Sequence, residues 1–121
     1  MTNNKEEIDR RAWQETLQAL TAEHGGDLAT VEVAGVDVGD QFAAEQVPFS
    51  YVEYDPHDDA VSVGVGGLDR SDPVVLRHVV EHPENIFVHA SEVESVTIEV
   101  RSPDGTVTLV TLKSPLELPN G

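Results

Sequence analysis

Several kinds of residue are scarce in this 121-residue sequence, and each scarcity excludes a class of protein. There is no cysteine, which excludes disulfides, thiolate metal sites and a cysteine nucleophile. No apolar run approaches the roughly 20 residues that a membrane-spanning helix needs. The first residues, MTNNKEEIDRR, contain no apolar stretch typical of a signal peptide. We therefore expect a cytoplasmic protein that does not enter a membrane.

Aromatic residues are also few, namely one Trp, two Tyr and three Phe, so the core must be mostly aliphatic. Hydrophobic residues make up 39% of the sequence, which suits a globular protein. A chain of this length can bury one core, so we expect a single domain over residues 1–121.

Basic residues are scarce relative to acidic ones: 7 Lys and Arg stand against 23 Asp and Glu, giving a formal net charge of −16. The acidic residues are spread over the whole chain, which predicts an acidic surface rather than a disordered tail. A halophilic-type surface, screened by high salt, is the favoured interpretation. The alternative is a docking surface for a basic protein, including mimicry of nucleic acid. Binding to nucleic acid itself is disfavoured because the cations that neutralise phosphates are missing.

One amphipathic helix is expected at about residues 10–24, after a frayed N-terminal segment at residues 1–8. Asp9 is suited to cap the first turn of this helix because its carboxylate can accept from main-chain N–H groups. The apolar face of the helix is predicted by the spacing of three residues: Trp13, Leu17 and Leu20.

The clearest central feature is a β-hairpin at residues 47–67, where the turn DPHDD separates two β-forming runs. In the first run Val52 and Tyr54 break the alternation of Phe49 and Tyr51, which indicates burial on both sides for part of the strand. Alternation in the second run predicts one face of valines and one nearly bare face. The bare face consists of Ser62, Gly64 and Gly66. We expect another element to pack closely there, with the N-terminal helix as the natural candidate.

A strand with one wet face is expected at residues 29–33, which alternate apolar and polar. Residues 41–46 are weakly patterned, and we expect them to extend the following strand across a bend at Pro48.

The segment from Asp72 to His89 has two interpretations. Its β-branched residues favour strands near residues 74–80 and 86–89, joined by a turn at residues 82–85. Alternatively, Asp72–Pro73 could begin a short helix over residues 74–82.

A last hairpin is predicted at residues 95–112, where the turn SPDGT places Gly105 in the left-handed region. This turn fixes the strand register. The predicted cross-strand pairs are Val100 with Thr108, Ile98 with Val110 and Val96 with Leu112.

These elements predict an α+β fold with one helix packed on an antiparallel sheet of about six strands. The sheet is expected over about residues 28–112, as a curled sheet or small partly open barrel. Residues 114–121 are expected to form an irregular tail.

His78, His82 and His89 are the histidines that the sequence singles out as candidate metal ligands. His78 and His82 have the spacing of zinc-binding helices, but in a strand they lie about 13 Å apart and cannot share an ion. A turn at Pro83 would make His78 a cross-strand neighbour of His89, a pair that could hold a metal with a third ligand. No third ligand is identifiable, so ordinary imidazoles are favoured and no metal site is assigned.

The remaining chemistry-bearing residues match no catalytic or cofactor motif. Asp55, Asp58 and Asp59 crowd one turn, where turn chemistry explains them better than calcium binding. The chain has no GxSxG, GxGxxG or Walker sequence. We therefore assign no catalytic residue and no cofactor.

Several motifs resemble those of one family of short prokaryotic proteins, which is known only as a domain of unknown function. The motifs are Trp13, HGG at residues 24–26, ATVEVAGVDVGDQ at 29–41, YDPHDDAVSVGVGG at 54–67, RHVVEHPENIFV at 77–88 and SPDGTVTLV at 102–110. The resemblance covers about residues 8–116 and implies a single domain. It implies no catalytic residue, cofactor or substrate.

The sequence favours a non-catalytic interaction or assembly domain whose partner is another protein or a second copy, because the exposed edges of such a sheet often pair. One alternative is an acidic binder of a basic protein. Another is a metal-dependent enzyme or metal-binding protein that uses His78 and His89.

Overall fold

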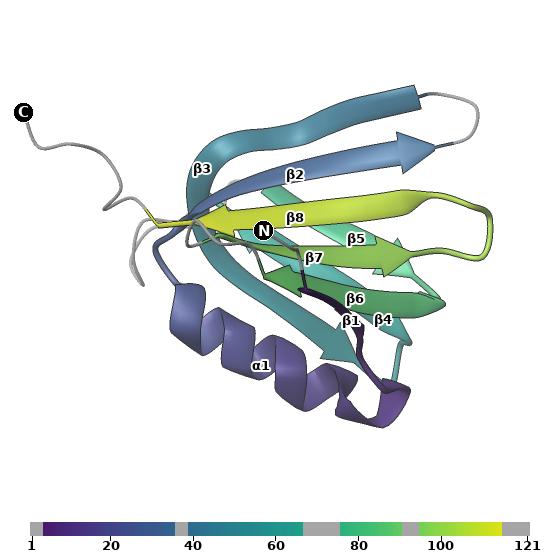
Figure 1. Cartoon of the computed structure of the whole chain (residues 1–121). Helices are drawn as coiled ribbons and strands as arrows, with labels where there is room; N and C mark the ends of the chain where they lie inside the picture. The colour runs from purple at the N-terminus through teal and green to yellow at the C-terminus, as the bar shows by residue number, and fades with distance from the viewer. Residues whose placement is uncertain (1–3, 36–38, 67–75, 91–94, 115–121) are drawn as a thin grey trace, which may run out of the picture.

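The computed structural model describes residues 4–35, 39–66, 76–90 and 95–114 as one helix and a large antiparallel sheet (Figure 1). The helix α1 spans Trp13–His24 and follows a short 3₁₀ helix, η1, at Arg10–Ala12. The strands are β1 (Asn4–Glu7), β2 (Leu28–Gly35), β3 (Gly39–Asp55), β4 (Ala60–Val65), β5 (Leu76–Glu81), β6 (Asn85–Ala90), β7 (Ser95–Arg101) and β8 (Val107–Lys113). The predicted α+β class is confirmed, but the sheet formed by the described residues has eight strands rather than about six.

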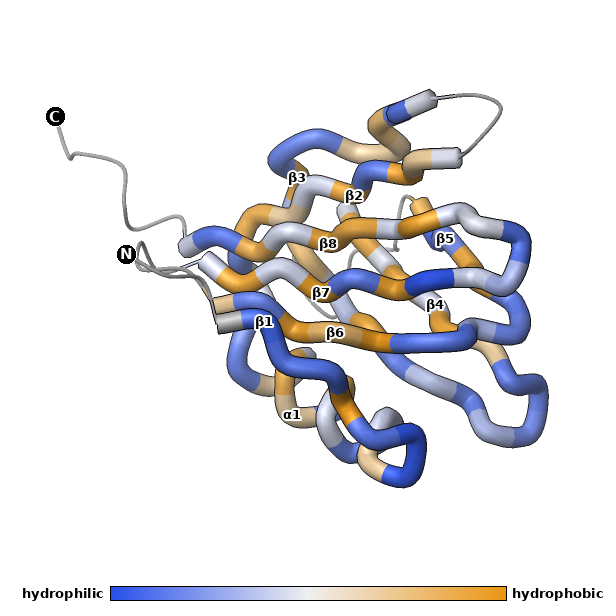
Figure 2. Tube along the Cα trace, turned by 45° about the vertical axis from the view of Figure 1, so that its right-hand side comes forward, coloured by the Kyte–Doolittle hydropathy of each residue, from blue (hydrophilic) through white to orange (hydrophobic). Residues whose placement is uncertain are grey.

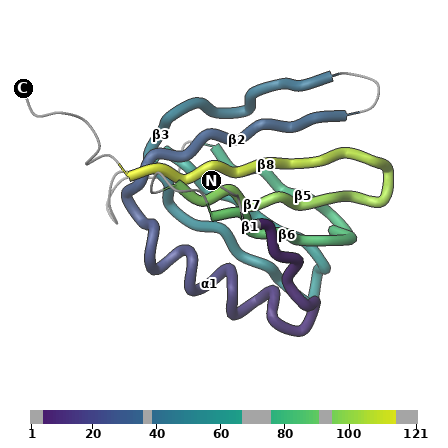
Figure 3. The backbone as a smooth tube through the Cα atoms, in the orientation of Figure 1, coloured from purple at the N-terminus to yellow at the C-terminus, as the bar shows by residue number. Residues whose placement is uncertain are grey.

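The sheet is folded into two layers that share β3. All paired strands run antiparallel, in the order β1-β6-β7-β8-β2-β3-β4-β5. The first part of β3 pairs with β2 and the second part pairs with β4. Figures 1 and 3 show β4 and β5 behind the layer that contains β6, β7 and β8. The strands at the two ends of this order, β1 and β5, do not pair with each other in the described chain, so the sheet is not closed.

The strand β3 is 17 residues long because it belongs to both layers. Its backbone turns near Gln46, whose φ is 51°. Pro48 follows directly and cannot donate a ladder hydrogen bond. The predicted extension of residues 41–46 across a bend at Pro48 is therefore confirmed.

A β-bulge explains the irregular pattern in the second half of β3. Phe49 pairs with Val65 and Tyr51 pairs with Gly64, so one extra residue lies between Phe49 and Tyr51. Phe49 and Val52 are both buried as a result. The inserted residue, rather than burial on both faces of the strand, produces the broken alternation.

The bare face of β4 is covered by a neighbouring side chain instead of by the helix. A Cβ atom added at Gly64 would overlap the ring of Tyr51, which lies across from it on β3. Helix α1 packs on β3. The expectation that α1 covers Ser62, Gly64 and Gly66 is therefore wrong, because the bulge in β3 had already turned Tyr51 onto that face.

Helix α1 shields the second half of β3. Trp13 and Leu17 are buried, as the predicted apolar face requires. The Thr21 hydroxyl accepts from the Val52 N–H at 3.0 Å and donates to the Val52 carbonyl at 2.8 Å. The hydroxyl therefore binds the two main-chain groups of Val52 that a neighbouring strand would otherwise bind.

In the described chain, no helix is both long enough and apolar enough to cross a membrane.

The core lies between the two layers and α1. Figure 2 shows hydrophobic and hydrophilic residues alternating along β7 and β8, as expected for strands with one buried face. The buried hydrophobic cluster comprises Trp13, Leu17, Ala29, Val31, Phe49, Val52, Tyr54, Val61, Val63, Val65, Val80, Ile86, Ile98, Val100, Val110 and Leu112.

The predicted register of the last hairpin is confirmed. The observed pairs include Val100–Thr108, Ile98–Val110 and Val96–Leu112. Gly105 has a φ of 94°, and its N–H donates to the Ser102 carbonyl at 3.0 Å. Local turn chemistry therefore determines this part of the sheet.

The N-terminal segment is not frayed as predicted, because residues 4–7 form β1 and pair with β6. The Lys5 ammonium lies 4.7 Å from the centre of the Phe87 ring. The Ile8 N–H then donates to the Ile86 carbonyl at 2.9 Å. Cross-strand contacts to β6, rather than any apolar pattern of its own, order this strand.

The predicted hairpin between residues 74–80 and 86–89 is wrong, although both strands exist. Strand β5 pairs with β4, whereas β6 pairs with β1 and β7. Residues 72–75, where a helix could have begun, lie outside the described chain, and so does the expected tail apart from Ser114.

Candidate functional site

Among the described residues, the first half of β3 presents a strand edge without a paired neighbour, called the free edge below. Residues 39–47 pair with β2 on one side, and no strand of the described chain pairs with the other side. The free edge ends at Pro48, whose carbonyl accepts from the Gly66 N–H at 2.7 Å. Most residues from Gly39 to Gln46 are exposed. The second half of β3 has no comparable free edge. There the Thr21 hydroxyl accepts from the Val52 N–H, and the Phe49 N–H donates to the Asp27 carbonyl at 2.8 Å. The free edge therefore has main-chain donors and acceptors that an added strand could bind.

An apolar groove lies beside this edge, on the inner side of the sheet. Its volume is about 470 Å³. It opens where β3 bends away from the end of β4 and the start of β5. The groove is lined by Ala43, Ala44, Val47, Pro48, Val65, Gly66 and Leu76.

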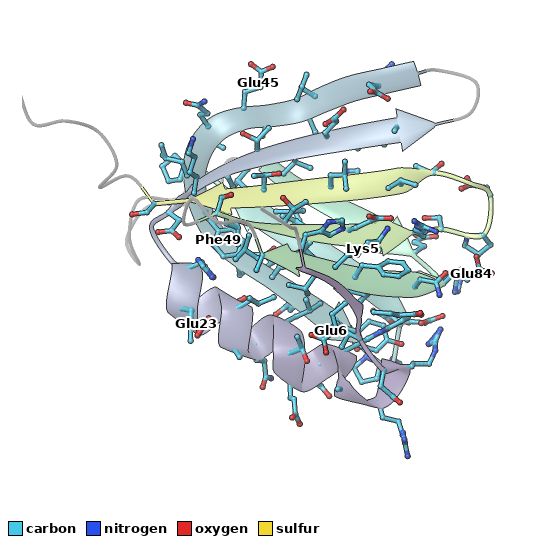
Figure 4. The ribbon with its side chains drawn as sticks, viewed as in Figure 1. Lys5, Glu6, Glu23, Glu45, Phe49 and Glu84 are labelled. Atoms are coloured by element: carbon cyan, nitrogen blue, oxygen red, sulfur yellow. The ribbon has the colours of Figure 1, made fainter. Side chains whose placement is uncertain are left out.

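The outer side of the same edge is acidic and carries one exposed aromatic ring. Phe42 is 56% exposed. Glu45 points from β3 into solvent at the top of Figure 4. Beside them, burial raises the pKa of the Glu32 carboxyl, and the Asp40 carboxylate raises it further. Neither Glu32 nor Asp40 forms an ion pair with a cation in the described residues, so a cation placed here would relieve their repulsion.

The structure separates the two histidines that were expected to be neighbours. His78 on β5 lies across from Val63, whereas His89 on β6 lies across from Thr97 and Lys5. The cross-strand pair of His78 and His89 is therefore wrong, because β5 and β6 belong to different layers. In the described part of the chain, no group of three His, Asp or Glu residues is arranged to hold a metal ion.

His82 instead joins a polar cluster around Asp59. The Asp59 carboxylate accepts from the Tyr54 hydroxyl at 2.7 Å, and the His82 Nδ1 atom lies 3.2 Å away. Arg10 approaches the same carboxylate at 3.4 Å and donates to the Pro83 carbonyl at 3.2 Å. The hydrogen bond from Tyr54, followed by the one from His82, lowers the pKa of Asp59. This cluster ties the β3–β4 turn to the β5–β6 connection.

The other aspartates of the DPHDD turn behave as turn residues. The Asp55 carboxylate accepts from the His57 N–H at 2.9 Å, the geometry of an Asx turn. The Asp58 carboxylate lies 3.3 Å from the exposed ring of its neighbour His57.

A second polar cluster surrounds Glu99 on the outer face of the sheet and was not anticipated from the sequence. Glu99 is only 6% exposed. Its carboxylate lies 3.0 Å from His89 Nε2, 2.6 Å from Arg101 Nε and 3.6 Å from Lys5 Nζ. Lys5 and Arg101 also lie over the ring of Phe87. Every charge here has a partner, so the cluster is best explained as a clamp across β1, β6 and β7.

Comparisons with known proteins identify relatives without an assigned activity. A family model described as "Family of unknown function (DUF5335)" matches residues 4–121. An uncharacterized protein from Aquifex aeolicus is 27% identical over 112 residues, which cover 93% of this chain and 95% of the relative. No solved structure gives a significant match.

Proposed function

The chain belongs to DUF5335, a family of unknown function, and on that premise we propose a function from its own geometry: it is a non-catalytic interaction domain that binds an extended basic segment of a partner protein. The free edge of β3 beside the apolar groove is the observation that supports this function. The proposal includes a cytoplasmic location and a salt-adapted surface, both of which are expected from the sequence.

Strand addition explains how the edge and the groove work together. An extended segment would hydrogen-bond to the free main-chain groups of residues 39–47. Its side chains would alternate between the two faces, as in any strand. Those on the inner face would enter the apolar groove, and those on the outer face would meet Phe42 and the nearby carboxylates. The segment that fits has apolar and basic residues in alternation.

Charge favours a basic partner over a second copy of this chain. Two copies would each bring a formal charge of −16 to the contact. At low salt this repulsion opposes a homodimer, whereas a basic segment is attracted from a distance. Glu32, Asp40 and Glu45 lie on or next to the edge that the segment would occupy.

A heptapeptide of alternating Lys and Val, blocked at both ends, tests this function directly. Titration into ¹⁵N-labelled protein should shift the amide signals of residues 39–47 and slow their hydrogen exchange. A peptide with proline at its centre is the control, since proline cannot continue the ladder. Equal shifts with both peptides, or shifts that avoid residues 39–47, would overturn the proposed function.

Two exposed hydrophobic residues provide a matched pair of variants. Phe42→Ser removes the aromatic contact beside the edge and should weaken peptide binding about tenfold, as expected for partial burial of such a ring. Val79→Ser removes a similarly exposed residue from β5, 43% exposed, and should leave binding unchanged. Gel filtration in low and molar salt tests whether a second copy of the chain binds the free edge instead. If the protein is a dimer at low salt and Phe42→Ser dissociates it, the partner is a second copy and not a basic segment.

A further inference from the structure

A second opening lies at the other end of the space between the two layers. It has a volume of about 540 Å³, within the range of small-molecule sites. Its inner walls come from Val33 and Thr108 on one layer and from His78 and Val80 on the other. The groove beside β3 shares none of these residues. We call this opening the β5–β8 cleft.

Thr108 is the unexplained residue of this cleft. It is 1% exposed, and its hydroxyl has no hydrogen-bond partner in the described residues. It belongs to the inward row of β8 that continues with the core residues Val110 and Leu112. A buried hydroxyl without a partner destabilises a fold, and valine would fill the same space without this penalty. A threonine in this position is explained if something that enters the cleft binds its hydroxyl.

The opposite wall supplies a second polar group that is also without a hydrogen-bond partner in the described chain. His78 alternates with the exposed residues of β5 and faces inward beside Val80. Burial lowers the pKa of His78, so its ring is neutral at pH 7 and offers one donor and one acceptor. His82, which also lines the cleft, differs because its Nδ1 atom already contacts Asp59.

The rim of the cleft is acidic. Glu81 and Asp104 both line it. The Asp104 carboxylate accepts from the Thr106 N–H at 3.0 Å, which keeps it ionised. A ligand that fits all of these groups has an ammonium group for the rim, an aliphatic body for Val33 and Val80, and a neutral hydroxyl for the interior.

We propose that the β5–β8 cleft binds a small amino alcohol, with its ammonium group at Glu81 and Asp104 and its hydroxyl at Thr108 and His78. This site is independent of the peptide site on β3. The proposed interaction is reversible, non-covalent binding.

Three probes of similar size test the cleft by NMR titration: 4-amino-1-butanol, n-butylamine and 1-butanol. The amino alcohol should cause saturable shifts of His78 and Thr108, with a dissociation constant on the order of 1 mM, which a ligand of this size can reach. Each of the other two probes lacks one of the two interactions and should bind at least about fivefold more weakly. If n-butylamine binds as tightly as the amino alcohol, binding is due to surface ion pairing alone and the proposed site is overturned. The absence of saturable shifts would also overturn it, and a buried water would then be the partner of the Thr108 hydroxyl.

A matched pair of variants on one strand separates binding from folding. Thr108→Val removes the unpaired hydroxyl, so it should leave the free protein at least as stable and weaken the amino alcohol about fivefold. Thr111→Val makes the same change on the opposite face of β8, where the hydroxyl contacts Thr97 at 3.2 Å. It should leave ligand binding unchanged. If Thr108→Val binds the amino alcohol as tightly as the wild type does, the cleft is not the site.

Discussion

The ring of Tyr51 occupies the space that a side chain at position 64 would fill, so the two residues form one packing unit across β3 and β4. Gly64→Ala should therefore destabilise the protein by about 1–3 kcal/mol, the usual range for overpacking. Urea unfolding would measure this change. Gly25→Ala is a suitable control because the nearest atom to the added methyl group, the Thr21 carbonyl oxygen, is 3.5 Å away. Equal losses in the two variants would contradict the specific contact with Tyr51.

Thr21 should be needed for its hydroxyl rather than for its shape. Thr21→Val leaves the Val52 N–H and carbonyl without partners, at an expected loss of about 2 kcal/mol in unfolding free energy. Thr21→Ser keeps the hydroxyl and should lose less. Hydrogen exchange at the Val52 amide provides the local measurement, and it should accelerate in the valine variant alone. Unchanged exchange there would mean that α1 does not protect this edge.

The cluster around Asp59 should contribute to stability above acidic pH and lose that contribution in acid. Its hydrogen bonds lower the pKa of Asp59 in the folded state below the ordinary value of 3.8. A group with a depressed folded-state pKa stabilises the fold above the unfolded-state pKa, and this contribution disappears as pH falls through the folded-state pKa. Asp59→Asn should therefore lower the Tm at pH 7, and its difference from the wild type should shrink below pH 3.8. Asp58→Asn, which alters only the contact with His57, should change the Tm little at either pH.

Glu32 should oppose folding of the free protein while supporting peptide binding. Burial and Asp40 raise its pKa in the folded state, so ionisation of Glu32 disfavours the fold once pH exceeds the unfolded-state pKa. Glu32→Gln should raise the Tm at pH 7 and weaken binding of the Lys–Val peptide. Calorimetry and the NMR titration measure the two effects. A variant that is stabilised but binds equally well would remove Glu32 from the proposed interface.

A salt series tests whether the acidic surface is adapted to high salt. A net charge of −16 distributed over the chain repels itself, and salt screens exposed charges that lie farther apart than about 10 Å at 0.1 M ionic strength. The Tm should therefore rise from low to molar salt. Sodium chloride and potassium chloride should act alike if screening is the cause. An unchanged Tm would count against salt adaptation.

The parts of the fold that were predicted correctly are those that local chemistry determines. The SPDGT turn fixes the register of β7 and β8 because Gly105 adopts a conformation that other residues rarely adopt. The spacing of Trp13 and Leu17 likewise identified the buried face of α1. In both places, residues close in sequence determine the local conformation or the buried face.

The sequence predicts a hairpin after β5, but the backbone there changes its hydrogen-bond partners from one layer to the other within three residues. The His82 N–H donates to the Asp59 carbonyl at 2.8 Å, whereas the Glu84 N–H donates to the Arg101 carbonyl at 2.7 Å. Pro83, which has no N–H, lies between them. A short turn between two strands usually makes a hairpin, and only contacts with distant residues could show that the chain passes to the other layer here.

The candidate sites were beyond sequence reasoning for a similar reason. A free edge depends on which strands fail to pair, and residues 41–46 have no pattern that distinguishes an edge from an interior strand. Thr108 was predicted to face Val100, which is correct, but not to lie unpaired in a cleft. The cleft forms only when β5 is placed opposite β8.

The continuity of β3 through the bend at Gln46 also has a consequence for how the protein unfolds. Since one strand supplies hydrogen bonds to β2 in one layer and to β4 in the other, neither layer can lose its pairing without releasing part of the same backbone. Local unfolding of one layer therefore also disturbs the other layer, which raises the free energy of such partial opening. We expect the two layers to melt in a single cooperative transition, with coincident changes in Trp13 fluorescence and far-UV circular dichroism.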